Sequence, residues 1–125
     1  MYQLLLVALG GGLGAALRHL SGIAALRLFG SGFPYGTLFV NVVGSFVMGA
    51  FIELLTRRFG GSNELRLFVA TGVLGGFTTF SSFSLDTAFL TERGDLALAA
   101  LYVIGSVVLG IAALFAGLAL VRSLA

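Results

Sequence analysis

Four apolar segments, each about as long as a membrane span, take up most of this 125-residue chain. They cover about residues 4–28, 37–55, 64–91 and 96–121. A helix of about 20 apolar residues crosses a bilayer, and only helices or closed barrels can do so, because backbone polar groups find no water there. Only 10% of the residues are charged, against about 25% in a soluble domain. The sequence predicts an all-α membrane protein, with residues 1–125 forming a single integral-membrane domain.

Short connections rich in Gly, Ser, Asn and Asp join these segments, so neighbouring helices are expected to pack antiparallel. Four arginines flank the spans on the side that holds both termini, and two flank them on the other side, or three if the Arg18 side chain extends to that side. The first group is Arg57, Arg58, Arg66 and Arg122, and the second is Arg18, Arg27 and Arg93. A bias this weak permits insertion in both orientations. Because four helices cannot easily enclose a pore, we expect a dual-topology chain that forms an antiparallel homodimer.

The third segment carries polar residues at its middle, where residues 75–84 read Gly-Gly-Phe-Thr-Thr-Phe-Ser-Ser-Phe-Ser. Two adjacent glycines followed by hydroxyl residues suit a helix that is interrupted at mid-membrane and lines a polar path or binds an ion. Unwinding near residues 75–79 would free carbonyl oxygens, which suit a hard cation such as Na⁺. The half-helix after the break would direct its positive end at the interior.

Several side chains within the spans suggest a route for an anion. Asn41 either bonds to another helix or offers its amide NH₂ to an anion. Phe80 and Phe83 share a helix face, and the positive edges of their rings could hold a small anion without a full charge, so that the anion can still leave. The hydroxyls of Tyr102 and Ser106 are spaced i, i+4.

Two further hydroxyls and two charged side chains are also candidates among the polar groups of the spans. With Ser81 and Ser82, the Tyr102 and Ser106 hydroxyls either form a ladder of donors or bond back to their own helices. Arg18 either extends to the lipid headgroups or is a buried cation that pairs with carbonyls or attracts anions. Asp86 lies toward the end of its span, where it can face the headgroups.

Other functional classes fit the composition less well. Cysteine is absent, which excludes disulfides and thiolate chemistry. No nucleophile–base pair or metal cluster indicates an enzyme, and no basic stripe indicates a nucleic-acid partner. The alternative is a small dual-topology, proton-coupled exporter of lipophilic cations, but that mechanism needs a membrane-embedded carboxylate, and the first segment has none. A purely structural subunit would show no flux by itself.

The chain resembles the Fluc family of fluoride channels, which are small four-helix proteins that work as dual-topology dimers. The resemblance covers all four spans and rests on three stretches: residues 11–18, residues 36–44, and residues 71–84 with their Thr-Thr-Phe-Ser-Ser-Phe-Ser string. Ser82 stands where the family usually has threonine, and Asp86 where it has glutamate.

The resemblance implies a fluoride-selective channel with two pores per dimer that exports fluoride passively across the bacterial cytoplasmic (inner) membrane. Its partners would be fluoride, membrane lipid and a second copy of the chain, and it would confer fluoride resistance. Arg18 would organise a vestibule, Asp86 would take a relay role, and the Gly75 and Thr78 carbonyls would hold a structural Na⁺ at the dimer interface. The fluoride pathway would comprise Asn41, Phe80, Phe83, Ser81, Ser82, Tyr102 and Ser106.

Overall fold

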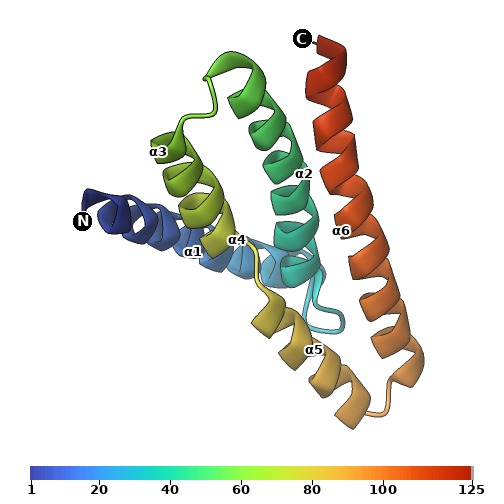
Figure 1. Ribbon diagram of the computed structural model, residues 1–125. Coiled ribbons are helices and arrows are strands. Elements are labelled where there is room, and N and C mark those ends of the chain that lie inside the picture. The colour runs from blue at the N-terminus through green and yellow to red at the C-terminus, as the bar shows by residue number, and fades with distance from the viewer. Residues whose placement is uncertain (125) are drawn as a thin grey trace.

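The computed structural model describes residues 1–124, which form helices and short connections without a strand (Figure 1). Three spans are single helices: α1 (Tyr2–Phe29), α2 (Tyr35–Arg58) and α6 (Leu96–Leu124). The third span, Asn63–Glu92, is divided into sections. These are α3 (Asn63–Leu65), the π-helix η1 (Arg66–Leu74), α4 (Gly75–Phe77) and α5 (Phe80–Glu92).

All four spans are long and apolar enough to cross a membrane. The predicted all-helical architecture with four membrane-capable helices is therefore confirmed. Each span contains the corresponding apolar segment and extends past it at most ends, because the terminal turns include polar residues such as Arg57 and Arg122. A helix can carry such residues where it reaches the headgroups.

The spans pack as two pairs. In one pair α2 lies along α6, and in the other α1 crosses η1 and α4 (Figure 1). The second crossing is close because both faces are glycine-rich: Gly10 and Gly14 are the buried residues of α1. A Cβ atom on Gly14 would fall against the Val73 carbonyl oxygen, and one on Gly76 against that of Gly11. Small residues thus let the two backbones touch, as in many membrane bundles.

The same device joins α2 to α6. A Cβ atom on Gly49 would collide with the Leu114 carbonyl, and one on Gly117 would collide with the Phe46 carbonyl. Because each helix places a glycine against the backbone of the other, the two helices pack closely together.

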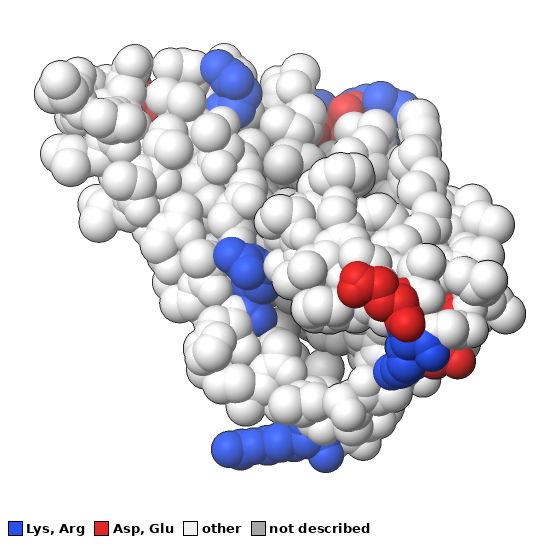
Figure 2. Space-filling model, turned by 90° about the horizontal axis from the view of Figure 1, so that it is seen from below, with Lys and Arg blue, Asp and Glu red and all other residues white. Residues whose placement is uncertain are grey.

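Polar side-chain contacts join neighbouring elements at the two ends of the bundle. At one end the Arg93 Nη2 donates to the Gly32 carbonyl, which ties the α5–α6 loop to the α1–α2 loop. At the other end Arg57 and Arg122 both donate to Glu53, which joins α2 to α6. Charged side chains are otherwise few and scattered over an apolar surface (Figure 2). That surface suits a chain surrounded by lipid.

The third span is interrupted at Thr78 and Thr79, within the region where the sequence predicts a break. Thr78 (φ −87°, ψ 158°) and Thr79 (φ −155°, ψ 120°) are extended, and the helix resumes at Phe80. The Thr79 side chain caps the new helix by accepting a hydrogen bond from the Ser82 amide, 3.1 Å away. The Thr78 amide still donates to the Leu74 carbonyl at 3.0 Å. The Thr79 amide leaves the helical pattern, so it needs another partner.

Candidate functional site

Asn41 on α2 pairs with the backbone of the break through both ends of its amide. The Asn41 Nδ2 donates to the Thr79 carbonyl at 3.1 Å, and the Thr79 amide donates to the Asn41 Oδ1 at 2.7 Å. Asn41 therefore makes the interhelical bond that was one of its two predicted roles. Its NH₂ group carries a second hydrogen, so it can still donate to another acceptor.

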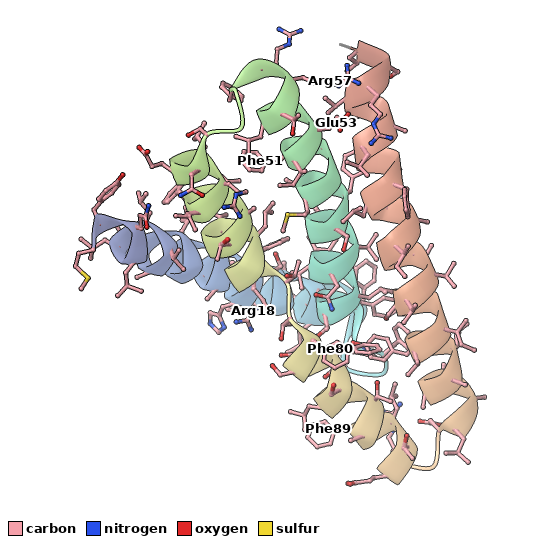
Figure 3. All side chains as sticks on the ribbon, in the orientation of Figure 1. Arg18, Phe51, Glu53, Arg57, Phe80 and Phe89 are labelled. Carbon is pink, nitrogen blue, oxygen red and sulfur yellow. The ribbon has the colours of Figure 1, made fainter. Side chains whose placement is uncertain are left out.

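Arg18 on α1 approaches the break from the other side. Its Nε donates to the Gly76 carbonyl at 3.0 Å, and the residue is only partly exposed (Figure 3). Of the two predicted orientations, the structure has the one that pairs with a carbonyl. Arg18 and Asn41 thus brace the two sides of the interruption, and Arg18 brings a positive charge to it.

The carbonyls of Gly75 and Thr78, which the sequence suggests as cation ligands, have lost their usual helical donors. In a continuous helix the Thr79 and Ser82 amides would donate to them. Here the Thr79 amide donates to Asn41 and the Ser82 amide to the Thr79 hydroxyl. Carbonyl oxygens without helical donors are the ligand type that a hard monovalent cation takes in a broken membrane helix. The residues present therefore fit Na⁺.

A cavity of about 320 Å³ lies beside the break, between α2, α5 and α6. Its wall contains four predicted pathway residues: Asn41, Phe80, Phe83 and Ser106. The Phe80 and Phe83 ring centroids are 5.6 Å apart, and Phe80 lies at the start of α5 with 78% of its surface exposed (Figure 3).

Ser106 has the most informative hydroxyl of this cavity. Its Oγ is buried and has no hydrogen-bond partner within residues 1–124. A buried hydroxyl without a partner costs about 1–3 kcal/mol, so this oxygen is suited to a ligand that enters the cavity. The wall is otherwise mostly apolar, with Val107 and Ile111 beside Ser106.

The structure does not bring Ser81 and Ser82 to this cavity. Consecutive residues point about 100° apart around a helix, so with Phe80 and Phe83 facing α6 the two serines point elsewhere. The Ser81 hydroxyl lies 3.2 Å from that of Thr79, and Ser82 lines a different cavity beside Arg18. A single ladder joining them to Ser106 is therefore not what the structure shows.

Tyr102 is buried and its hydroxyl donates to the Asp86 Oδ2 at 3.0 Å. The sequence analysis does not predict this pair, because it places Asp86 toward the headgroups. A signal was present, because Asp86 and Tyr102 are each eight residues from Gly94 in the α5–α6 turn. Residues placed symmetrically about a tight turn lie opposite each other in an antiparallel helix pair.

Fold and site together define a class: an all-helical, multi-pass membrane protein with polar contacts gathered at an interrupted third span. Residues 5–118 match the family described as CrcB-like protein, Camphor Resistance (CrcB), and the chain belongs to this family. It is 60% identical over 124 residues to a fluoride-specific ion channel FluC of Mesorhizobium japonicum, with 99% of both chains covered. The resemblance to Fluc channels is thereby confirmed.

Two further relatives agree. The chain is 57% identical over 124 residues to a fluoride-specific ion channel FluC of Agrobacterium fabrum, again with 99% of both chains covered. It is 60% identical over 120 residues to a fluoride-specific ion channel FluC 2 of Nitrobacter hamburgensis, with 96% of this chain and 97% of the relative covered. The similarity thus includes every span.

Proposed function

We propose that this chain is a fluoride-selective channel that lets fluoride leave the cell passively across the cytoplasmic membrane. The observation that carries the proposal is the cavity beside the break, where Asn41, Phe80, Phe83 and the unpartnered Ser106 hydroxyl meet. The relatives that match nearly the whole chain are named fluoride-specific ion channels, which supports fluoride as the anion that this chain conducts.

The cavity provides uncharged hydrogen-bond donors to a dehydrated anion. The second hydrogen of the Asn41 amide and the Ser106 hydroxyl can each replace a water of hydration, and the positive ring edges of Phe80 and Phe83 can replace others. Because a full positive charge would hold the ion too tightly, weak donors of this kind favour conduction over trapping. Arg18, which bonds to the backbone at the break, would raise the local concentration of anions.

We further propose that two copies assemble as an antiparallel homodimer with two pores. Phe80 lines the cavity yet is 78% exposed, so one chain by itself leaves the pathway open on one side. A second copy would close it. The Gly75 and Thr78 carbonyls of the two breaks would hold a structural Na⁺ at the interface. The ion would offset the repulsion between carbonyl oxygens that face one another.

The proposed function is tested by fluoride efflux from liposomes that contain the purified protein, with a potassium ionophore to dissipate the membrane potential. We expect fluoride to leave rapidly and chloride to stay inside. Protein-free liposomes are the control for leakage. Equal fluxes of the two halides would overturn the selectivity, and fluxes of both at the level of the control would overturn the channel.

The Na⁺ site has its own test. Purification and assay with a large organic cation in place of Na⁺ should dissociate the dimer or abolish flux, because no large cation fits between carbonyls. An unchanged dimer with unchanged flux after such an exchange would remove Na⁺ from the proposal. Li⁺ and K⁺ serve as matched controls for ion size.

A further inference from the structure

Six aromatic rings form a continuous series of contacts between the α1–α2 loop and the helix break. The ring centroids are 4.9 Å apart for Phe29–Tyr35, 5.0 Å for Phe33–Tyr35, 5.5 Å for Phe33–Tyr102, 5.1 Å for Phe83–Tyr102 and 5.6 Å for Phe80–Phe83. These separations fall within the contact range for aromatic pairs. The series therefore continues the two pore phenylalanines toward the loop end of the bundle.

A second cavity of about 350 Å³ opens at that end, between the α1–α2 loop and α5. Phe33 and Tyr35 form part of its wall, together with Asp86 and Arg93. Phe33 is half-buried and meets Tyr102 edge-on, with an angle of 86° between the ring planes. Since Tyr102 in turn contacts Phe83, the Phe33 ring lies between this loop-end cavity and the cavity beside the break.

Arg93 supplies the positive charge of the loop-end cavity. Its Nη2 is held by the Gly32 carbonyl at 2.9 Å and its Nε by the Asp95 carboxylate, so the guanidinium is fixed at the cavity wall. The Asp86 carboxylate also faces this cavity but accepts a hydrogen bond from Tyr102. The Asp95 and Asp86 carboxylates offset the guanidinium charge, so Arg93 acts locally: the N–H groups that Gly32 and Asp95 do not occupy can donate to a halide at the wall.

We propose that the loop-end cavity is a mouth of the anion pathway, with Arg93 donating to the halide and Phe33 as the ring past which it enters. This inference rests on the proposed channel function and deepens it. It adds two residues, Phe33 and Arg93, to the path between the break and the aqueous phase, and its ligand is a small hydrated halide.

The test uses the absence of cysteine from the chain. A single thiol is introduced by Ser31→Cys in the loop that lines the cavity, and is modified in detergent with a thiosulfonate reagent that adds either a sulfonate or a trimethylammonium group. We expect the sulfonate to lower fluoride flux at least about tenfold and the ammonium to lower it much less, because the two groups differ in charge more than in size. Thr91→Cys, at the same end but outside the cavity wall, is the matched control.

A second pair of variants tests the ring. Phe33→Leu should lower fluoride flux, whereas Phe29→Leu, an exposed member of the same aromatic series that does not line the cavity, should not. Dimer elution on gel filtration checks that each variant is folded. Two results would overturn the proposal that this cavity is a mouth: equal effects of the two reagents at residue 31, with complete modification confirmed by mass spectrometry, or equal flux in the two leucine variants. Normal flux of the wild-type protein in the same experiments would leave the proposed channel function intact. Loss of wild-type flux itself would instead overturn the proposed function.

Discussion

The Asn41 amide is matched to the one residue whose backbone leaves the helix most completely. An amide side chain has one donor end and one acceptor end, so it can accept from the Thr79 amide, which has lost its helical acceptor, and also donate to the Thr79 carbonyl. A carboxylate has the same shape but no donor, and a hydrocarbon side chain has neither group. The break is therefore stabilised by a residue on a different helix, 38 positions away.

Asn41→Asp should impair conduction. The new oxygen would face the Thr79 carbonyl oxygen where Nδ2 now donates, and a negative charge would stand in an anion route. Losing a hydrogen bond of this kind costs about 1–3 kcal/mol, so we expect flux to fall about five- to hundredfold in liposomes. Asn63→Asp, at the exposed start of α3, is the control and should conduct normally. Wild-type flux in Asn41→Asp would make Asn41 a packing residue only.

Phe80→Ile and Phe83→Ile should each reduce fluoride flux and leave the dimer folded. Isoleucine keeps the apolar volume but has no ring edge to present to an anion. Phe115→Ile, on an exposed face of α6, is the matched control. Flux is measured by electrode and folding by gel filtration. If both pore variants conduct as well as Phe115→Ile, the rings have no part in permeation.

Among the elements, the first half of the third span depends on its contact with α1. Residues 66–74 form a π-helix, in which the wider turn changes which residues face a neighbour. Glycines of α1 lie against the backbone of the third span, and a glycine of the third span lies against the backbone of α1. A Cβ atom on Gly10, Gly14 or Gly76 would collide with a carbonyl oxygen of the facing helix. The position of the break relative to α1, and so the Arg18–Gly76 bond, follows from this packing.

Gly14→Ala should destabilise the protein, because its methyl group would collide with the Val73 carbonyl. Overpacking of this kind costs about 1–3 kcal/mol. Gly12→Ala is the matched control in the same helix, where a Cβ atom meets nothing within 4 Å. Alanine there should be neutral or stabilising, since it favours the helix. Thermal unfolding in detergent compares the two, and equal midpoints would contradict the close crossing.

The start of α5 depends on one side chain, the Thr79 hydroxyl that caps it. Thr79→Ala removes the acceptor for the Ser82 amide and should cost about 1 kcal/mol, whereas Thr79→Ser keeps the cap. Thr91→Ala removes a hydroxyl that bonds back to its own helix and should cost less. Unfolding midpoints that rank the three variants otherwise would show that the cap is not needed.

For the whole molecule, the question is how a single four-helix chain completes a pathway. The cavity beside the break is bounded by α2, α5 and α6 of the one chain, while Phe80 remains largely exposed. The charged groups do not favour one orientation, because each end of the bundle has both signs: Glu53 with Arg57 and Arg122 at one end, and Asp95 with Arg93 at the other. Both observations support the proposed antiparallel homodimer.

Dual topology predicts that a cysteine at the end of α6 is reached from both sides of the membrane. In Ser123→Cys, which carries the only thiol of the chain, a reagent that cannot cross the membrane should label about half of the protein in intact cells, as the weak arginine bias implies. The rest should react after the cells are opened. Glu64→Cys, on the same side, should give the same proportion. Complete labelling or none would establish a single orientation.

The class of fold could be predicted from the amino-acid sequence alone. Apolar segments of span length leave the backbone no choice but helices, and glycines followed by Thr-Thr-Phe-Ser predict where the third span is interrupted. These properties are local, because they follow from the bilayer and from the conformational preferences of neighbouring residues. Asn41 and Ser106 could also be selected as polar residues within apolar spans, and Phe80 and Phe83 as rings on one helix face among hydroxyl residues.

Which polar groups pair with each other depends on how the helices are arranged in three dimensions. Asn41 bonds to Thr79, Arg18 to Gly76 and Tyr102 to Asp86, and in each case the partner lies on another helix. Such pairs depend on the rotation and depth of whole helices, which the close glycine contacts at the crossings help to set. That geometry also separated Ser81 and Ser82 from Ser106, because one turn of α5 directs its phenylalanines and its serines to different sides.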